Sequence, residues 1–406
     1  MPHPIPHLLV IGGGFAGMWA ALTGAREFAN AGVDARVTVI ARDEYLTVRP
    51  RLYEVFTETM RAPLAPVFAP LGISLAVGEV RAIDTRAGRV SFIDGDGTQH
   101  GAHYDRLVLA AGSRQRALDV PGAAEFAFDI DTFAGAQRLD EQLQRCVDAV
   151  GETGAGTVVI VGAGFTGIEL AAEMRNRLRV HGGDAAADGA RIVLVERARE
   201  VGPDLGALPR PYIEEALRGA RVELKLGAGI TSIERDGVIL AGGERIATAT
   251  VIVTAGLAAS PLAGQLGVAT DVQGRLPVDT ALRVQGVPQV FAAGDIAHAK
   301  TDDSHLALMS CQHAVPMGKH AGYNAARELL KLPLTDYRQP DYVTCLDLGD
   351  YGALFTTGWD RQPAQWGAEV KPLKRKINTQ WIYPPAGDRD AILAAAALDA
   401  PWPPLD

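Results

Sequence analysis

Two glycine-rich segments of this chain have residue types and spacing that suit phosphate binding. In the first, Gly12, Gly14 and Gly17 form G-x-G-x-x-G directly after the apolar run 8–11. In such a turn the first glycine permits the sharp change of direction, the second lets a pyrophosphate approach the backbone, and the third lets strand and helix pack closely. A helix that begins there also offers unpaired N–H groups and a positive dipole end. This segment therefore predicts a dinucleotide site.

The same pattern returns 150 residues later. Gly162, Gly164 and Gly167 follow the apolar run 158–161. Each copy precedes a second apolar strand, a small β-meander with turn residues, and a buried strand that ends in small residues. Two matches with the same downstream order predict two related dinucleotide-binding units, because chance rarely repeats an order of elements.

The two units differ where their second strand ends. A Rossmann unit usually has an acid there, which binds a nucleotide ribose. The second unit has Glu196 at this position, but the first has Ala41 after the strand expected at 35–40. We therefore expect Asp43, Glu44 or the backbone to hold the ribose in the first unit.

The composition limits the class of protein. The chain has 406 residues, 48% hydrophobic and 21% charged, which is typical of a globular protein with two or three domains. A net charge of −9 argues against a nucleic-acid partner. Residues 1–7 do not resemble a signal peptide, and no apolar run approaches the roughly 20 residues that span a bilayer, so any membrane contact is expected to be peripheral. No residues are assigned to a metal.

A third segment, Ala292 to Asp295 (A-A-G-D), completes a recognisable set of motifs. With the two glycine loops, and with the A-A-G that ends at Gly112, the chain resembles the two-dinucleotide-binding-domain flavoproteins, the pyridine nucleotide-disulfide oxidoreductase superfamily. Within it, residues 37–55 and 312–319 are most similar to type II NADH dehydrogenases, which are single-subunit NADH:quinone oxidoreductases. The resemblance covers residues 7 to about 330.

This resemblance implies an α/β fold with two Rossmann-like domains, the second inserted into the first, plus a small C-terminal α+β segment. It implies FAD and NADH as cofactors. The expected boundaries are residues 1–116 and 262–334 for the FAD domain, 117–261 for the NAD(P)H domain, and 335–406 for the C-terminal segment, which would form the acceptor site, a dimer contact or a membrane-surface contact.

The resemblance also implies roles for individual residues. Glu169 would lie near the nicotinamide. Gln312 and His313 would lie at a helix N-terminus that faces the flavin, where the dipole stabilises negative charge on the reduced ring, and we predict all three to be catalytic. Glu196 would accept a hydrogen bond from the ribose and favour NADH, although Arg197 and Arg199 leave NADPH open. The residues expected to bind cofactor are Gly12, Gly14, Phe15, Ala16, Gly17, Arg42, Arg49, Val80, Ala111, Gly112, Gly162, Gly164, Gly167, Glu196, Gly256, Gly294, Asp295 and Ala314.

The cysteines exclude one branch of the superfamily. Disulfide reductases need a C-x-x-C or C-x4-C pair, and Cys146, Cys311 and Cys345 form neither. We interpret Cys311 and Cys345 as small packing residues. The resemblance to type II NADH dehydrogenases implies a quinone as the first choice of electron acceptor. A specialised metabolite, a ferredoxin-like carrier and a slow redox sensor that binds FAD and NADH remain as alternatives.

The basic residues are expected to lie on solvated faces: Arg49 and Arg51, and the run Lys374 to Lys376. Residues 371–383 combine cations with aromatic side chains, a composition suited to an anionic lipid surface. Alternatively, this segment closes over the flavin or forms a homodimer contact. The expected location is cytoplasmic, with a peripheral position on the inner face of the membrane as an option, and the tail 401–404 is expected to be extended.

Overall fold

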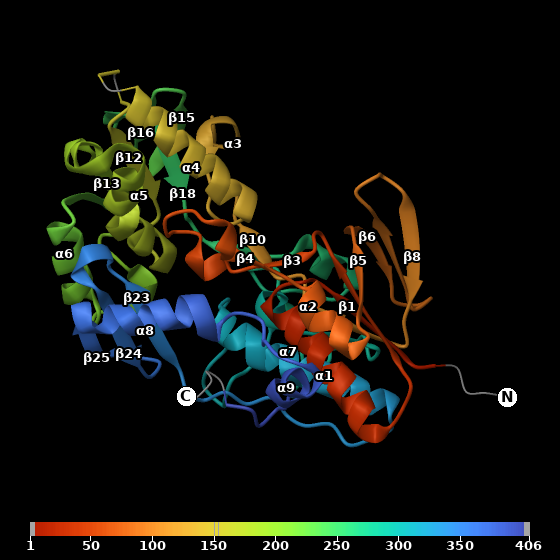
Figure 1. Cartoon of the computed structure of the whole chain (residues 1–406). Coiled ribbons are helices and arrows are strands. Elements are labelled where there is room, and N and C mark those ends of the chain that lie inside the picture. The colour runs from red at the N-terminus through yellow and green to blue at the C-terminus, as the bar shows by residue number, and fades with distance from the viewer. Residues whose placement is uncertain (1–4, 150, 153, 402–406) are drawn as a thin grey trace.

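The computed structural model describes residues 5–149, 151–152 and 154–401. Residues 1–4, part of the segment considered as a signal peptide, and residues 402–404 of the expected extended tail lie outside the described residues. Two lobes, each built on a parallel sheet, are visible in Figure 1, with the C-terminal segment against both. The prediction of an α/β fold with two Rossmann-like units is confirmed.

The first sheet has five parallel strands. Residues 8–11 in its central strand are at most 3% exposed, as expected for a parallel strand covered on both faces. The second strand begins at Arg36 and includes Ala41, one residue later than the sequence pattern indicated. In sheet order the strands are β21 (Val290–Ala292), β9 (Arg106–Leu109), β1 (His7–Ile11), β2 (Arg36–Ala41) and β5 (Ser74–Val77).

The second sheet has the same parallel design, and its strands lie in the sequence between β9 and β21. The second lobe is therefore an insertion into the first. The chain passes from the first lobe to the second and later returns. At these two crossings, β10 (Ser113–Gln115) pairs antiparallel with β19 (Leu257–Ala259). The sheet order is β11 (Ala127–Phe128), β18 (Thr250–Val253), β12 (Thr157–Val161), β13 (Arg191–Glu196) and β14 (Val222–Leu226), with helices α4 (Phe133–Asp148), α5 (Phe165–Gly189) and α6 (Arg210–Gly219).

Each lobe also carries the expected three-stranded meander. Both meanders are antiparallel and lie outside the main sheets. Their strands are β6 (Glu79–Asp84), β7 (Arg89–Ile93) and β8 (Gln99–His103) in the first lobe, and β15 (Ile230–Glu234), β16 (Gly237–Leu240) and β17 (Arg245–Ala247) in the second. A short ribbon, β3 (Tyr45–Thr47) with β4 (Arg61–Pro63), follows β2.

Helices α1 (Phe15–Ala31) and α7 (Cys311–Leu329) pack against each other almost at backbone contact. A Cβ added at Gly318 would lie 2.3 Å from the Ala16 carbonyl oxygen, and one at Gly322 would lie 2.0 Å from that of Ala20. These glycines therefore set the separation of the two helices whose N-termini face the first glycine loop.

Pro316 lies in the second turn of α7, because the helix begins at Cys311. A proline there leaves the carbonyl four residues earlier without its helical donor. The side chain of Gln339 replaces that donor, with Nε2 donating to the Gln312 carbonyl oxygen at 3.1 Å. The helix thus continues through the proline.

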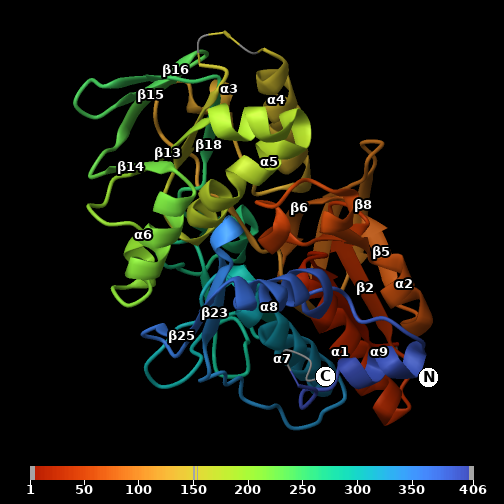
Figure 2. The same ribbon diagram turned by 60° about the vertical axis from the view of Figure 1, so that its left-hand side comes forward.

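The C-terminal segment folds as a small sheet followed by short helices. Its first two strands lie on either side of Gly349 and Gly352. In Figures 1 and 2 this blue segment lies beside α5 of the second lobe and runs to α1 of the first. Its elements are β23 (Val343–Asp347), β24 (Ala353–Thr357), β25 (Gln362–Gly367), α8 (Lys371–Lys376), a π-helical turn (Ile377–Trp381) and α9 (Arg389–Ala395). In the described part of the chain, no helix is both long and apolar enough to cross a bilayer.

The α1–α7 contact yields a stability prediction. Gly322→Ala forces a methyl group against the backbone of α1, so we expect a loss of about 1–3 kcal/mol in the free energy of unfolding. Gly219→Ala, at the end of α6 with no heavy atom within 4 Å of the new methyl, should be neutral or slightly stabilising. Urea unfolding of both variants checks this, and an equal loss in the two would contradict it.

Candidate active site

Three long helices begin at the same end of their sheets without a side-chain cap. The N-cap residues of α1, α5 and α7 are Gly14, Gly164 and Ser310, and none makes a capping hydrogen bond through its side chain. In α4, by contrast, Thr132 accepts from the Gly135 N–H. The three uncapped helices keep N–H groups and a positive dipole end available for electron-rich groups.

The first glycine loop forms a cradle that is closed at two glycines and open at the third. Gly12 has a φ of +114°, and a Cβ there would lie 2.2 Å from the Ala110 carbonyl oxygen. A Cβ at Gly17 would lie 1.9 Å from the Gly12 carbonyl oxygen, whereas one at Gly14 would meet nothing within 4 Å. The open side at Gly14 is where a pyrophosphate fits against the helix N-terminus.

The second glycine loop repeats this geometry. Gly162 has a φ of +104°, and a Cβ at Gly167 would lie 1.9 Å from the Gly162 carbonyl oxygen. Gly164 again faces open space. The two loops are thus equivalent in their backbones, so side chains around them must distinguish the two sites.

One such difference lies at the end of the second strand of each unit. In the inserted unit, the buried Glu196 carboxylate accepts hydrogen bonds from the N–H groups of Ala163, at 2.8 Å, and Ala198, at 2.9 Å. These bonds fix the carboxylate beside the loop, and each of its oxygens retains a lone pair for a ribose hydroxyl.

In the first unit the equivalent place is apolar. A Cβ at Gly13 would lie 2.9 Å from both the Ala41 and the Leu64 side chains, so there is no carboxylate beside this loop. Arg42, Asp43 and Glu44 follow on the exposed surface, and the Asp43 carboxylate accepts the Tyr45 N–H in a local turn. The ribose of the first unit therefore has no carboxylate in the position that Glu196 occupies.

Asp295 lies in a polar cluster near the end of β21. Gly294, with a φ of +74°, turns the chain there. Ser113 Oγ donates to Asp295 Oδ2 at 2.6 Å, and Arg49 Nη1 lies 3.6 Å from the same oxygen. Arg49 also pairs with Asp131. Burial raises the pKa of Asp295, which Arg49 and Ser113 oppose.

The expectation that Arg49 and Arg51 are solvated is therefore wrong. The Arg49 guanidinium is held by carboxylates from distant parts of the chain, and the Arg51 guanidinium by the nearby Glu54 and by the distant Tyr383. Arg51 is 8% exposed, its Nε donates to Glu54 at 3.0 Å and its Nη1 donates to the Tyr383 hydroxyl at 2.5 Å. Sequence spacing gave no sign of the contacts with Asp131, Asp295 and Tyr383, because tertiary packing alone brings these partners together.

The first turn of α7 places Gln312 and His313 between the first sheet and the C-terminal sheet. His313 is fully buried, its Nδ1 lies 3.0 Å from Ser310 Oγ, and burial lowers its pKa to about 4. The ring is neutral at pH 7 and stacks on Tyr342 at 5.6 Å. With its amide oriented to satisfy both partners, Gln312 donates to the Val343 carbonyl oxygen at 2.7 Å and accepts its N–H at 3.2 Å.

Glu169, on α5, forms a buried ion pair with Lys374 of α8. Lys374 Nζ lies 2.8 Å from Glu169 Oε1, and the two side chains are only 6% and 5% exposed. Lys374 also donates to the Cys345 carbonyl oxygen at 3.0 Å. Burial raises the pKa of Glu169 to about 7, against the lowering effect of Lys374. The pair can therefore hold or release a proton near neutral pH.

Lys374 was expected on a solvated face, and the structure corrects this. Its basic neighbours suggested a surface run, but α8 turns this one lysine inward while Arg375 remains exposed. The structure buries Glu169, and a buried carboxylate requires a partner. Nothing in the sequence identified which of the cations would supply it.

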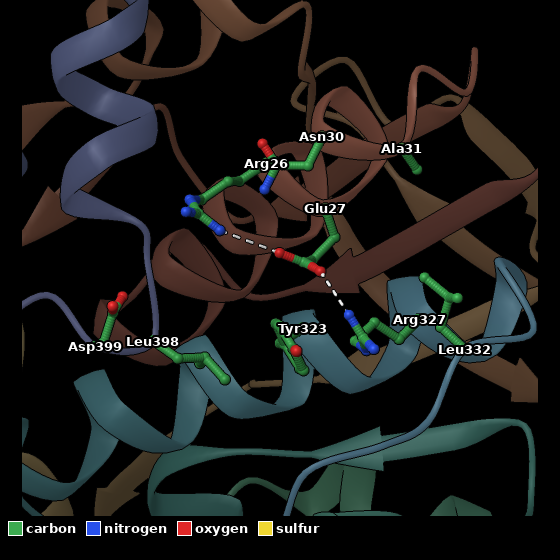
Figure 3. Close-up of a pocket in the computed structure, with 9 residues that line it drawn as sticks. All are labelled: Arg26, Glu27, Asn30, Ala31, Tyr323, Arg327, Leu332, Leu398 and Asp399. Carbon is green, nitrogen blue, oxygen red and sulfur yellow. Dashed lines mark hydrogen bonds and ion pairs between the residues drawn. The ribbon is translucent and has the colours of Figure 1, made fainter.

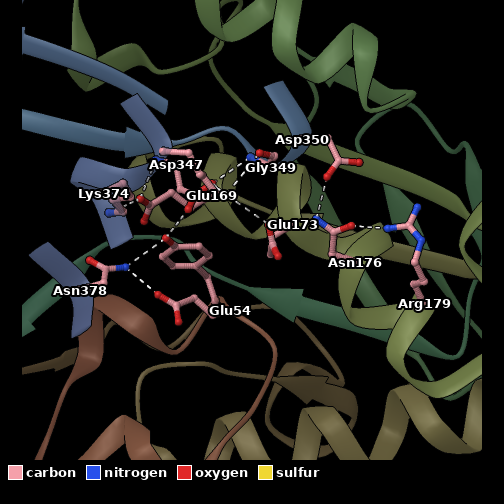
Figure 4. A network of polar contacts seen from close by, with 12 residues as sticks. Glu54, Glu169, Glu173, Asn176, Arg179, Asp347, Gly349, Asp350, Lys374 and Asn378 are labelled. Carbon is pink, nitrogen blue, oxygen red and sulfur yellow. Dashed lines mark hydrogen bonds and ion pairs between the residues drawn. The ribbon is translucent and has the colours of Figure 1, made fainter. Parts of the chain in front are cut away.

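A wider polar network surrounds this pair (Figure 4). Asp347 donates its N–H to Glu169 at 3.0 Å, and its carboxylate accepts from the buried Tyr53 hydroxyl at 2.9 Å. Asn378, in the π-helical turn, donates to Tyr53 at 3.2 Å and to Glu54 at 2.7 Å. The first lobe, the second lobe and the C-terminal segment thus all contribute to one network. Sequence reasoning missed Tyr53, Asp347 and Asn378, which match no motif.

The remaining predicted cofactor residues lie in the two glycine loops, at strand ends or at the start of α7. Gly112 and Gly256 have φ values of +65° and +73° and face open space. Val80 is in β6, a strand of the first meander, and Arg42 follows β2 on the surface. The others of this group are Phe15, Ala16, Ala111 and Ala314, which lie at the first turn of α1, at the end of β9 and at the first turn of α7.

The cysteines do not form an active thiol pair. All three are free in the described part of the chain. Burial raises the pKa of Cys311 and of Cys345 to about 11, so both are thiols at neutral pH and weak nucleophiles. This agrees with their interpretation as packing residues.

A cavity of about 500 Å³ lies elsewhere, between the far ends of α1 and α7 (Figure 3). Its buried carboxylate, Glu27, is already paired with Arg26 at 3.2 Å and with Arg327 at 3.4 Å. These helices present their N-termini, not these ends, to the glycine loops. The lining residues are Arg26, Glu27, Asn30, Ala31, Tyr323, Arg327, Leu332, Leu398 and Asp399.

Comparison with known proteins agrees with this geometry. The family described as pyridine nucleotide-disulphide oxidoreductase matches residues 6–318. The chain is 47% identical to an NADH dehydrogenase-like protein of Mycobacterium tuberculosis, over 96% of this chain and 98% of the relative. It is 30% identical to a type II NADH:quinone oxidoreductase of the same organism, over 71% of this chain and 66% of the relative. The structure of NDH2 from Plasmodium falciparum in complex with NADH superposes with a TM-score of 0.78 and 12% identity, over 94% and 95% of the two chains.

The buried ion pair yields a second prediction. Lys374→Met leaves a buried carboxylate without its partner, so we expect the free energy of unfolding to fall by about 3–5 kcal/mol. Arg375→Met, which removes an exposed cation from the same helix, should change it by less than about 0.5 kcal/mol. Adding Glu169→Gln to Lys374→Met should restore most of the loss, because no isolated charge then remains. Urea unfolding measures all three, and a double variant no more stable than Lys374→Met would contradict this explanation.

Proposed function

The chain belongs to the pyridine nucleotide-disulphide oxidoreductase family, and on that premise we propose that it is an FAD-dependent NADH dehydrogenase that reduces a quinone-type acceptor. The observation that carries the proposal is the buried Glu169–Lys374 pair. The second glycine loop leads into the helix that carries Glu169, and β23, which Gln312 contacts, supplies a carbonyl to Lys374.

The residues present fit an FAD molecule in the first unit. The loop at Gly12 to Gly17 would hold its pyrophosphate, and Asp295 would accept from its ribityl chain. The uncapped N-terminus of α7 would lie at the flavin. When bound, FAD supplies the hydride acceptor and the two-electron donor. The protein contributes the positions of both nucleotides and the positive end of α7.

The second unit would hold NADH. Its loop at Gly162 to Gly167 has the same open cradle, and Glu196 is fixed where a ribose 2′-hydroxyl can donate to it. A carboxylate there repels a 2′-phosphate. Arg197 and Arg199 are exposed beside it, so NADPH is the alternative nucleotide.

Proton balance assigns a role to the Glu169–Lys374 pair. Oxidation of NADH by a quinone consumes one proton from water for each quinol formed. His313 is neutral at pH 7, whereas Glu169 and Lys374 share a proton at a buried place with a carboxyl pKa near 7. The pair would therefore deliver that proton to the acceptor oxygen.

The acceptor would lie against the C-terminal segment, which supplies Lys374. Quinones dissolve in lipid, so this proposal includes a peripheral membrane contact near that segment. A specialised metabolite, a ferredoxin-like carrier and slow turnover as a redox sensor are the competing outcomes of the test below.

The direct test uses the purified holoenzyme without oxygen. NADH should bleach the flavin absorbance rapidly, and menadione or a short-chain ubiquinone should restore it within the same time range. Glu169→Gln should leave the bleaching step nearly unchanged and slow the restoring step by about 10²-fold or more, because it removes a proton donor. Stopped-flow absorbance measures both steps. Bleaching without reoxidation by any quinone would reject the acceptor assignment, and a long-lived complex with NADH would favour the sensor.

The two equivalent loops allow a matched pair of variants. Gly14→Val and Gly164→Val each place a side chain in open space, so both should fold. Gly14→Val should lower FAD content by about tenfold or more, whereas Gly164→Val should keep FAD and raise the KM for NADH by a similar factor, since blocking each pyrophosphate removes at least about 1.4 kcal/mol of binding. Flavin absorbance and steady-state kinetics distinguish these results. The reverse pattern would mean that the nucleotides are assigned to the wrong loops.

A further inference from the structure

A second lysine of α8 forms another ion pair next to the Glu169–Lys374 pair. Lys371 Nζ lies 2.5 Å from Asp347 Oδ1 and 3.7 Å from Glu173 Oε2. The side chain of Lys371 is 28% exposed, whereas that of Lys374 is 6% exposed. We therefore refer to Asp347 and Lys371 as the outer pair, and to Glu169 and Lys374 as the inner pair.

Asp347 connects the two pairs. Its backbone N–H donates to Glu169 Oε1 at 3.0 Å, so the residue fixes the position of the Glu169 carboxylate. Its own carboxylate is 7% exposed and is held by the Gly349 N–H at 2.9 Å and the Tyr53 hydroxyl at 2.9 Å. A second negative charge thus lies next to Glu169 in a place where water screens it weakly.

The two members of the outer pair act on Glu169 with opposite sign. The charge of Asp347 raises the pKa of Glu169, in addition to the larger effect of burial. Lys371 neutralises that charge from the solvent side. The other titratable groups that face the inner pair are Cys345 on β23, Cys311 on α7, Glu173 on α5, and Tyr53 and Glu54 from the first lobe.

We propose that Asp347 and Lys371 are positioning residues that set the protonation of Glu169, and through it the pH range in which the acceptor receives its proton. The inference rests on the proposed function. In each turnover the hydride of NADH supplies both electrons and one of the two hydrogens of the quinol. The inner pair gives the other, as a proton, to the acceptor oxygen and regains one proton from water. The outer pair itself transfers nothing; it stabilises one charge state of Glu169.

The test removes each charge of the outer pair in turn in the holoenzyme. Lys371→Met leaves Asp347 uncompensated, so the midpoint for Glu169 ionisation should rise by about one pH unit. Asp347→Asn removes the charge and keeps one oxygen as acceptor for the Gly349 N–H, although an amide NH2 replaces the oxygen that accepts from Tyr53. The midpoint should therefore fall by about one pH unit. The double variant should lie near the wild type, because each change cancels the other.

The midpoint is read from the pH-dependent infrared band of the Glu169 carboxyl group, identified by its loss in Glu169→Gln. The pH profile of flavin reoxidation by menadione should shift in the same directions. Arg375→Met, which removes an exposed cation from the same helix, should leave both midpoints unchanged. Flavin content and thermal melting show whether each variant folds.

Opposite shifts in the two single variants support the inference, whereas equal shifts in one direction, or a shift as large in Arg375→Met, overturn it. If Asp347→Asn fails to retain FAD, an upward shift in Lys371→Met supports the inference and an unchanged midpoint overturns it. Wild-type enzyme that no quinone reoxidises would reject the proposed function, and infrared midpoints that do not move would reject the control by the outer pair. The two failures are therefore distinguishable.

Discussion

The buried ion pair between Glu169 and Lys374 is the interaction on which the candidate site depends. Removing two charges from water is strongly unfavourable unless both are paired and hydrogen-bonded. The two residues come from different parts of the molecule, the inserted lobe and the C-terminal segment. The segment must therefore dock on α5 before the site exists, and docking also brings Asp347 and Asn378 to Tyr53 of the first lobe. One electrostatic constraint thus fixes the arrangement of three units.

The two glycine loops show how the same backbone can be adapted to two tasks. Gly12 and Gly162 have nearly the same φ. A Cβ added at Gly17 or at Gly167 would lie 1.9 Å from the carbonyl oxygen of the first glycine of its loop. The surroundings differ. Glu196 gives the second loop a fixed carboxylate, and Ala41 with Leu64 gives the first an apolar wall. Close steric contacts therefore keep the backbone conformation of the two loops the same, while the polar side chains around the loops distinguish the two sites.

Runs of charged residues predicted the position of their side chains less well than the glycine patterns predicted the fold. Arg49, Arg51 and Lys374 belong to runs that look like solvated surface. Yet Arg49 and Lys374 pair with carboxylates of distant segments, and Arg51 donates to the distant Tyr383 hydroxyl as well as to the nearby Glu54. A cation needs only one acceptor within reach, and that acceptor can come from any element that packs nearby. Steric requirements are local, so a glycine pattern can be recognised, but an ion pair is defined only when two elements meet.

The sequence alone determined the α/β class and the two Rossmann-like units, because strand and glycine patterns are local and repeat within the chain. The roles of Glu169, Glu196 and the helix N-terminus at Gln312 are predictions that follow from the family resemblance. Tertiary structure decided the partner of Glu169, the neutral buried state of His313, the apolar wall at Ala41 and the role of the π-helical turn that carries Asn378. Each of these depends on burial and on contacts between segments far apart in sequence, and no local pattern encodes either.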